Sequence, residues 1–218
     1  PEKRGTTNNL KLPLKNGEVG TFKVTNLSIC DSNGKTESII GKLVDISKEA
    51  AEKEALVLKA RKDGLTGLYN SETSKDLIAE IINQKKKNTV DALVLLDVDM
   101  FKEINDRFGH YTGDRVLQKL AKNMKRIFHN TDIIGRLGGD EFCIYLRNIP
   151  SAEFVLDKCN ELNKLIIDTV KGLTISASMG IALVYESQPY DKLFKMADDA
   201  LYQAKRNGRR QAVIYNES

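Results

Sequence analysis

Two short acidic sequences in the second half of the chain carry the residues best suited to chemistry. In the first, Asp97 and Asp99 stand two residues apart at the end of an apolar, β-rich run. Side chains at this spacing in a strand project from the same face, so the pair can hold a cation. Strand ends also often carry solvated Asp residues that only begin a turn, and for this pair alone that alternative stays open.

The second acidic sequence is Gly-Gly-Asp-Glu, between two further β-rich runs. Gly138 and Gly139 have the composition of a two-residue hairpin turn, in which both central positions can require a positive φ angle. Asp140 and Glu141 follow directly, where a backbone without side chains lets a ligand approach closely. Mg²⁺ prefers hard oxygen ligands and usually completes its shell with water and substrate phosphates. Two acidic loops in one domain are therefore able to hold magnesium.

The elements that must position these loops follow from hydrophobic periodicity, which changes to alternating helical and β-rich segments after residue 63. The predicted elements are a helix around 77–82, a strand over 92–98, a helix over 116–128, strands over 132–137 and 141–146, a helix over 152–170, a strand over 173–184, a helix over 190–206 and a strand over 211–215. This order predicts an α+β fold with a central antiparallel sheet covered by helices, close to a ferredoxin-like palm.

The region before residue 48 has a different pattern. Short extended runs between Leu10 and Ile46, separated by Asn-Gly turn chemistry, predict antiparallel strands and hairpins. The sequence up to Asp45-Ile46-Ser47 resembles the closing strands of a PAS domain without its ligand-cradling first half; an unrelated β-hairpin appendage is the alternative. Ser47 is expected to cap a connecting helix. The predicted organisation is a partial PAS-like domain over 1–47, a signalling linker helix over 48–62 and a second domain over 63–218.

Composition excludes several classes of protein. An apolar content of 41% with 29% charged residues is typical of soluble globular proteins, and a net charge of +4 is too weak and dispersed for a nucleic-acid groove. Cys30, Cys143 and Cys159 form no Cys-x-x-Cys pair, which favours a reducing cytoplasm. No run approaches the roughly 18 apolar residues of a membrane span, so no membrane contact is expected within this segment. The sequence opens on Pro1, which leaves room for a membrane anchor upstream.

Taken together, the motifs resemble the GGDEF family of diguanylate cyclases. The pentamer Gly-Gly-Asp-Glu-Phe stands intact at 138–142, and the flanks match the family over about 155 residues, in order and at family spacing. The matching segments are D-x-L-T-G-L-x-N at 63–70, D-x-D-x-F-K-x-I-N-D at 97–106, G-H-x-x-G-D at 109–114 and A-D-x-A-L-Y-x-A-K-x-x-G-R at 197–209.

The resemblance implies a reaction and a set of roles. Two GTP molecules would condense to cyclic di-GMP with release of two pyrophosphates, with Mg²⁺ or Mn²⁺ as cofactor and a homodimer as the active form. The metal ligands would be Asp97, the carbonyl of Val98 and Asp140; Asp140 and Glu141 would be catalytic; and Asp99 would be secondary. The substrate-binding residues would be Leu65, Phe101, Lys102, Asn105, Asp114, Gly138, Gly139, Lys205 and Arg209, with Asn105 and Asp114 reading guanine and Lys102, Lys205 and Arg209 contacting phosphates.

Each of these residues also has a plainer interpretation. Asn105 could close a helix, Asp114 could sit at a helix start after Gly113, and the basic residues could be surface charges. Where many family members carry an inhibitory R-x-x-D site for the product, this chain has His129 and Asp132. Histidine lacks the charged, bidentate fork of arginine, so tight product inhibition is not expected from this degenerate inhibitory site.

Three alternatives compete with the cyclase interpretation. A catalytically silent GTP-binding module would show degenerate acidic residues, and a pure interaction module would need no intact acidic cluster; Asp97, Asp140 and Glu141 are all present. A cyclase that makes a mixed adenine-guanine product is disfavoured by Asp114, because a carboxylate accepts from the N1-H and exocyclic amine of guanine.

Overall fold

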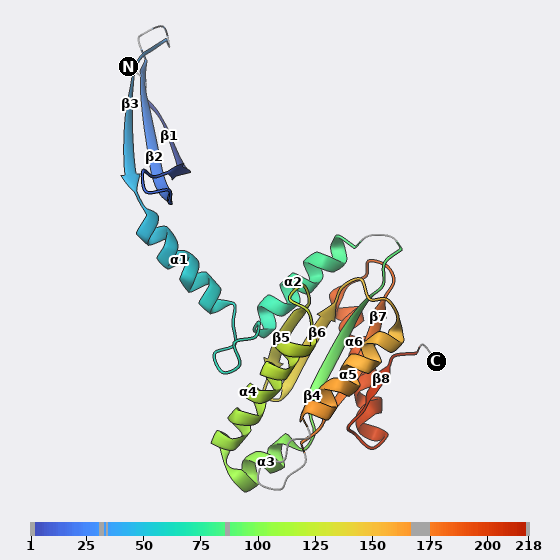
Figure 1. Ribbon diagram of the computed structural model, residues 1–218. Coiled ribbons are helices and arrows are strands. Elements are labelled where there is room, and N and C mark those ends of the chain that lie inside the picture. Colours follow the sequence, from blue (N-terminus) through green and yellow to red (C-terminus); the bar gives the residue numbers. More distant parts are fainter. Residues whose placement is uncertain (1–2, 31–32, 34, 86–87, 167–174, 217–218) are drawn as a thin grey trace. The chain divides into compact units, whose positions relative to one another are not determined.

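The computed structural model of the chain describes residues 3–30, 33, 35–85, 88–166 and 175–216 (Figure 1). The chain divides into two compact units, Pro1–Ala60 and Arg61–Ser218. The helix that the sequence marks as a linker is grouped with the first unit. The predicted helix residues 167–170 and strand residues 173–174 lie outside the described part of the chain.

The N-terminal unit is a three-stranded antiparallel sheet followed by one helix. Strands β1 (Lys3–Pro13), β2 (Val19–Cys30) and β3 (Thr36–Asp45) pair in the order β1-β2-β3, and α1 covers Ser47–Ala60. The prediction that Ser47 caps this helix is wrong. Ser47 is the first helical residue, and its hydroxyl accepts a hydrogen bond from the backbone N–H of Thr21 at 2.8 Å, which joins the start of α1 to β2.

Apolar side chains of this sheet remain exposed: Leu10, Ile39 and Leu43 on one face, and Ile40 and Val44 on the other. Phe22 lies opposite Leu10, and Val24 lies opposite Leu43, so these side chains share a face. Leu10, Ile39 and Leu43 are 46%, 66% and 57% exposed, and α1 contains no buried residue. Large apolar side chains gathered on an exposed face are typical of a surface that another polypeptide covers.

The second unit has the predicted α+β fold. Its elements are α2 (Ser71–Asn83), β4 (Asp91–Val98), α3 (Phe101–Phe108), α4 (His110–Ile127), β5 (Ile133–Gly138), β6 (Glu141–Leu146), α5 (Ala152–Ile166), β7 (Ala177–Val184), α6 (Tyr190–Arg206) and β8 (Ala212–Ile214). The sheet order is β5-β6-β4-β7-β8, with β4 at the centre. The first three pairings are antiparallel, as predicted; β8 adds a parallel strand beside β7.

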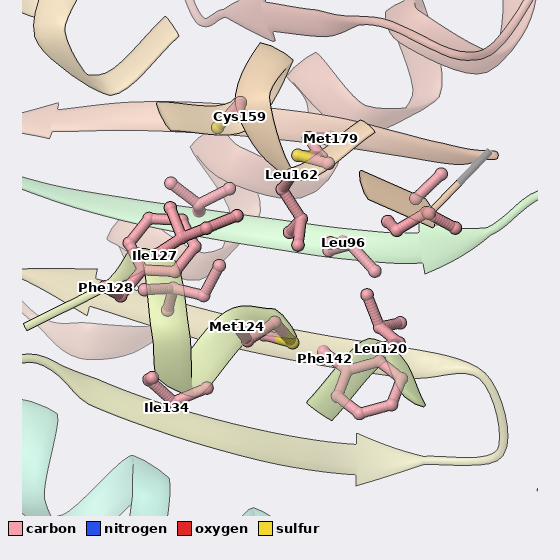
Figure 2. Packing of buried hydrophobic residues seen from close by; sticks show 14 of the residues in the cluster. Leu96, Leu120, Met124, Ile127, Phe128, Ile134, Phe142, Cys159, Leu162 and Met179 are labelled. Atoms are coloured by element: carbon pink, nitrogen blue, oxygen red, sulfur yellow. The ribbon is translucent and has the colours of Figure 1, made fainter. Parts of the chain in front are cut away.

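Helices bury both faces of this sheet. Alternate residues of β4 and β6, such as Leu96 and Phe142, pack with α3, α4 and α5 in the larger core (Figure 2). The intervening residues, such as Leu95 and Cys143, pack with α2 and α6. Helix α6 lies very close to β7, because a Cβ atom at Gly180 would be only 2.1 Å from the carbonyl oxygen of Ala197. This close packing fixes α6 against the sheet and holds its C-terminal end beside the end of β4.

Two boundaries differ from the predictions. The helix expected over 116–128 begins earlier, at His110, and is separated from α3 by Gly109, whose φ of 82° suits glycine. The hairpin turn is displaced by one residue, since β5 ends at Gly138 and the two-residue turn is Gly139-Asp140 rather than Gly138-Gly139. In the described ranges no helix is both long and apolar enough to cross a membrane.

Candidate active site

The end of the central strand carries the first candidate residue, Asp97. In the sheet it lies directly opposite Glu141 of β6 on one side and Ser178 of β7 on the other, so the carboxylates of Asp97 and Glu141 share the face covered by α6. The Nζ atom of Lys205, near the C-terminus of α6, is 2.8 Å from a carboxylate oxygen of Asp97. Strand pairing and the packing of α6 thus bring together three residues from distant parts of the sequence.

The turn between β5 and β6 carries the second candidate, Asp140. Gly139 adopts a φ of 50°, which a residue with a side chain rarely adopts. Its carbonyl oxygen accepts two hydrogen bonds from the Arg136 guanidinium, at 2.7 and 3.0 Å, and the carbonyl of Asp140 accepts one from the N–H of Val98 at 3.2 Å. The turn is therefore fixed at both of its residues, next to the end of β4.

Arg136 also joins this turn to the start of the unit. Its Nη1 lies 3.2 Å from both carboxylate oxygens of Asp63. Burial alone would raise the pKa of Asp63, but hydrogen bonds from Thr66 and Arg136 and the charge of Arg136 outweigh it and lower the pKa. No role for this pair was predicted from the sequence, although Asp63 opens the D-x-L-T-G-L-x-N segment and Arg136 stands two residues before Gly138. The pair connects the Gly139-Asp140 turn to the start of the second unit.

The acidic residues affect one another's ionisation. Burial, followed by the charges of Asp140 and Asp99, raises the pKa of Asp97 even though Lys205 opposes the shift. Burial and the charges of Asp97 and Asp140 likewise raise the pKa of Glu141, and Asp198 of α6 adds to this effect. Asp198 is a second contributor that the sequence analysis did not identify. The site holds more negative charge than Lys205 neutralises, which favours binding of a cation.

The donor set fits a metal that receives part of its shell from the substrate. Among the described residues no three His, Cys, Asp or Glu side chains are grouped as a complete metal site. The predicted ligands are two carboxylates, of Asp97 and Asp140, and one backbone carbonyl, of Val98. Mg²⁺ is usually held by one or two carboxylates together with waters and substrate phosphates, so an incomplete protein shell is what such a site needs.

Asn105 has the clearest local sign of a binding role. Its Oδ1 atom is buried and has no hydrogen-bond partner among the described residues. It lies against Gly113, where an added Cβ would be only 2.0 Å from that oxygen. A buried acceptor without a partner costs free energy, about 1–3 kcal/mol, unless a ligand supplies the donor. The alternative that Asn105 closes a helix does not hold, because α3 continues to Phe108.

Further predicted substrate residues lie on α3, on α4 and in the segment before α2. Asp114 is exposed and lies inside α4, whose N-cap is Gly109, so it does not begin that helix. Lys102 is exposed on α3, and Phe101 packs partly into the larger core. Leu65 also packs against that core, and its carbonyl accepts a hydrogen bond from Gln118 of α4.

The predicted degenerate inhibitory site forms a local turn at the opposite end of β5. The N–H of His129 donates to the Asp132 carboxylate at 2.8 Å, and the N–H of Asp132 donates to the carbonyl of His129 at 2.9 Å. The His129 ring lies 3.1 Å from the hydroxyl of Thr131. The six residues of β5 separate this turn from the catalytic turn by about 20 Å, at about 3.3 Å per residue.

Comparisons with known proteins show which family of domains the second unit resembles. The family model described as "Diguanylate cyclase, GGDEF domain" matches residues 60–211. The probable diguanylate cyclase DgcC of Escherichia coli is 34% identical over 173 residues, which are 77% of this chain and 47% of DgcC. The crystal structure of the coiled coil and GGDEF domain of DgcB from Caulobacter crescentus, in complex with c-di-GMP, superimposes with a TM-score of 0.73 at 26% identity, covering 78% of this chain and 93% of that one.

A further relative is named for an activity other than diguanylate cyclase activity. The cyclic di-GMP phosphodiesterase PdeR of Escherichia coli is 32% identical over 199 residues, which are 89% of this chain and 30% of PdeR. The chain spans less than half the length of DgcC and of PdeR. Similarity to these proteins therefore establishes the type of domain, and activity must be argued from the site.

The raised pKa of Glu141 predicts a pH-dependent stability. A carboxyl whose folded-state pKa is raised stabilises the fold fully below its ordinary value of 4.5 and loses that contribution as the pH rises through the folded-state pKa. Glutamine resembles the protonated form at all pH values. In urea unfolding with a chelator present, Glu141→Gln should match the wild type near pH 4 and be more stable at pH 8. The exposed Glu186→Gln serves as control; a Glu141→Gln protein less stable than the wild type at pH 8 would contradict the prediction.

Proposed function

The chain belongs to the GGDEF family of diguanylate cyclase domains, and we propose that residues 61–218 condense two GTP molecules into cyclic di-GMP. The observation that carries the proposal is the acidic cluster of Asp97, Asp140 and Glu141, complete in sequence and brought together by the pairing of β4 with β6. A silent nucleotide-binding relative would gain nothing from three carboxylates at one strand end, where burial and neighbouring negative charges raise the pKa of two of them.

The proposed chemistry is nucleotidyl transfer. The ribose 3′-oxygen of one GTP forms a bond to the α-phosphorus of the other, while the bond from that phosphorus to the bridging oxygen of the β-phosphate breaks and pyrophosphate leaves. A second, symmetrical step closes the ring. Such transfers are catalysed mainly by positioning and by neutralisation of charge.

Roles for the acidic residues follow from their positions. Asp97, Asp140 and the carbonyl of Val98 are proposed to hold Mg²⁺ or Mn²⁺, which would neutralise the triphosphate and acidify the attacking hydroxyl. Glu141 completes the cluster, and its raised pKa makes it a better proton acceptor near neutral pH than an ordinary glutamate. Gly138 and Gly139 leave open space beside the turn, since an added Cβ at either position meets nothing within 4 Å.

The remaining residues are proposed to bind the nucleotide. Asn105, with its buried unpartnered oxygen, and the exposed carboxylate of Asp114 would read guanine from α3 and α4, with Leu65 and Phe101 beside the base. Lys102, Lys205 and Arg209 would contact phosphates. Lys205 is paired with Asp97 at 2.8 Å in this structure, so it would turn from the carboxylate to the triphosphate when substrate and metal bind together.

The proposal extends to assembly and location. One domain of this type holds one GTP, so two domains must face each other, and we propose a homodimer joined through the PAS-like unit. The exposed apolar side chains of β1, β2 and β3 support this, because burying one leucine side chain contributes about 1.5–3 kcal/mol. Cytoplasmic location is supported by the three cysteines, which are all free and buried.

Removal of one carboxylate tests the activity. The wild type incubated with GTP and Mg²⁺ should give cyclic di-GMP and pyrophosphate on chromatography. Asp140→Asn should fold normally, since its volume hardly changes, but should lower kcat by about 100-fold or more. Asp157→Asn, an exposed position on α5, is the matched control and should behave as the wild type. GTP binding by the wild type without any product would instead identify a silent regulatory module.

Product inhibition should be weak in the wild type and restored by arginine. His129 lacks the bidentate charged fork that grips a phosphate, so His129→Arg should lower the inhibition constant of cyclic di-GMP by about tenfold. Asn130→Arg adds the same charge one residue away, outside the required spacing, and should change inhibition little. Strong inhibition of the unmodified protein would show that other residues make the phosphate contacts with cyclic di-GMP that arginine would make at position 129.

Activity should depend on association. Specific activity should rise with protein concentration in the dilute range, because only the dimer works. Leu43→Lys places a charge among the exposed apolar side chains of the sheet and should shift this rise to higher concentration, whereas Asn16→Lys, in the exposed turn between β1 and β2, should not. If specific activity stayed constant down to concentrations at which sedimentation shows only monomer, an active site formed between two facing domains would be ruled out.

A further inference from the structure

Asp99 is a buried acid for which the proposed reaction has no use. It directly follows β4 and is only 7% exposed. Its carboxylate accepts hydrogen bonds from the hydroxyls of Ser176 and Ser178, both at 2.6 Å, and from the backbone N–H of Arg210 at 3.1 Å. With three donors already bound, both oxygens of this carboxylate are engaged in holding protein groups together.

The Arg210 donor belongs to a segment with an unusual backbone. After α6 ends at Arg206, three consecutive residues have positive φ angles: Gly208 at 104°, Arg209 at 63° and Arg210 at 52°. Glycine accepts such angles, but each arginine in this region costs of order 1 kcal/mol and persists only where the surroundings enforce it. Strain at two adjacent non-glycine residues therefore requires strong local contacts.

The contacts of this segment turn it back toward the catalytic cluster. The N–H of Arg209 donates to the carbonyl of Ala204 at 3.0 Å, which brings Arg209 beside the residue that precedes Lys205. Gln211 is held on both sides: its side chain donates to the carbonyl of Asn207 at 2.8 Å, and its carbonyl accepts from the N–H of Met179 in β7 at 2.9 Å. Between these two attachments, Asp99 is the group that holds Arg210.

We propose that Asp99 is a positioning residue for GTP, which acts through the backbone of residues 208–210 to hold Arg209 next to Lys205. The inference rests on the proposed function, in which Lys205 and Arg209 bind the triphosphate. A carboxylate suits this task because it offers acceptors on both oxygens, whereas an amide would direct N–H groups at a donor. In this proposal Asp97 faces the substrate, and Asp99 holds the backbone of the segment whose Arg209 side chain binds the triphosphate.

A double-mutant cycle on the full chain tests this. Binding of a non-hydrolysable GTP analogue with Mg²⁺ is measured by calorimetry, and KM and kcat are measured with GTP, for Asp99→Asn, Arg209→Ala and the double variant. Asp99→Asn should weaken analogue binding and raise KM about tenfold, with a smaller change in kcat. In the Arg209→Ala background the same substitution should have almost no further effect, because its action passes through Arg209.

A rescue experiment separates positioning from general stabilisation. Arg210→Gly removes the cost of the left-handed φ at that residue, so it should restore part of the affinity lost in Asp99→Asn. Arg210→Ala, which also removes the side chain but keeps the strain, should restore none. If Asp99→Asn does not fold, Ser176→Ala, which removes one donor from the carboxylate, is taken through the same cycle with Arg209→Ala.

The outcomes distinguish this inference from the proposed function. Additive effects of Asp99→Asn and Arg209→Ala on analogue binding, or loss of kcat with unchanged affinity, would overturn the positioning role. A wild type that binds the analogue but makes no cyclic di-GMP would overturn the proposed activity, while the binding cycle would still decide the role of Asp99. A wild type that binds no analogue would overturn both.

Discussion

The burial of mutually repelling carboxylates at one end of the sheet is the constraint on which the rest of the second unit depends. Asp97 and Glu141 are paired across β4 and β6, Asp140 is the adjacent turn residue, and Lys205 is the one cation with an ion pair to this cluster among the described residues. Burial and proximity raise the pKa of two of these acids, so the unliganded site opposes folding near neutral pH. The stabilising free energy has to come from elsewhere in the unit.

That stabilisation comes from rigid packing immediately behind the site. Both faces of the sheet are buried, and α6 approaches β7 so closely at Gly180 that no side chain would fit between them. Arg136 holds the carbonyl of Gly139 while it forms an ion pair with the carboxylate of Asp63. A site held in this way keeps its carboxylates in place by itself, so the proposed cation and triphosphate would relieve repulsion and would not have to organise the residues.

The sequence predicted the strands and the helices of the second unit apart from α3, because hydrophobic periodicity indicates such elements directly. The helix α3, only eight residues long, was not predicted. The register of the catalytic turn was also missed, since Gly138-Gly139 and Gly139-Asp140 are both acceptable two-residue turns by composition. The hydrogen bonds from Arg136 to Gly139, made across the hairpin, favour the second. The parallel pairing of β8 and the Arg136–Asp63 pair were missed for the same reason: each is a contact between segments whose sequences contain no sign of the partner.

Asp97 and Asp99 show most clearly where a sequence pattern stops being informative. A spacing of two predicts a shared face only while the strand continues, and β4 ends at Val98. The two carboxylates are near enough for the charge of Asp99 to raise the pKa of Asp97, but they have different hydrogen-bond and ion-pair partners. Asp97 keeps one cationic partner, Lys205, that a substrate can draw away, whereas Asp99 is saturated by two hydroxyls and a backbone N–H. A carboxylate with exchangeable partners can take part in chemistry, and one with fixed partners can only maintain structure. The same residue type two positions apart therefore has opposite uses, and the difference lies in Ser176, Ser178 and Arg210, at least 77 residues further along the chain.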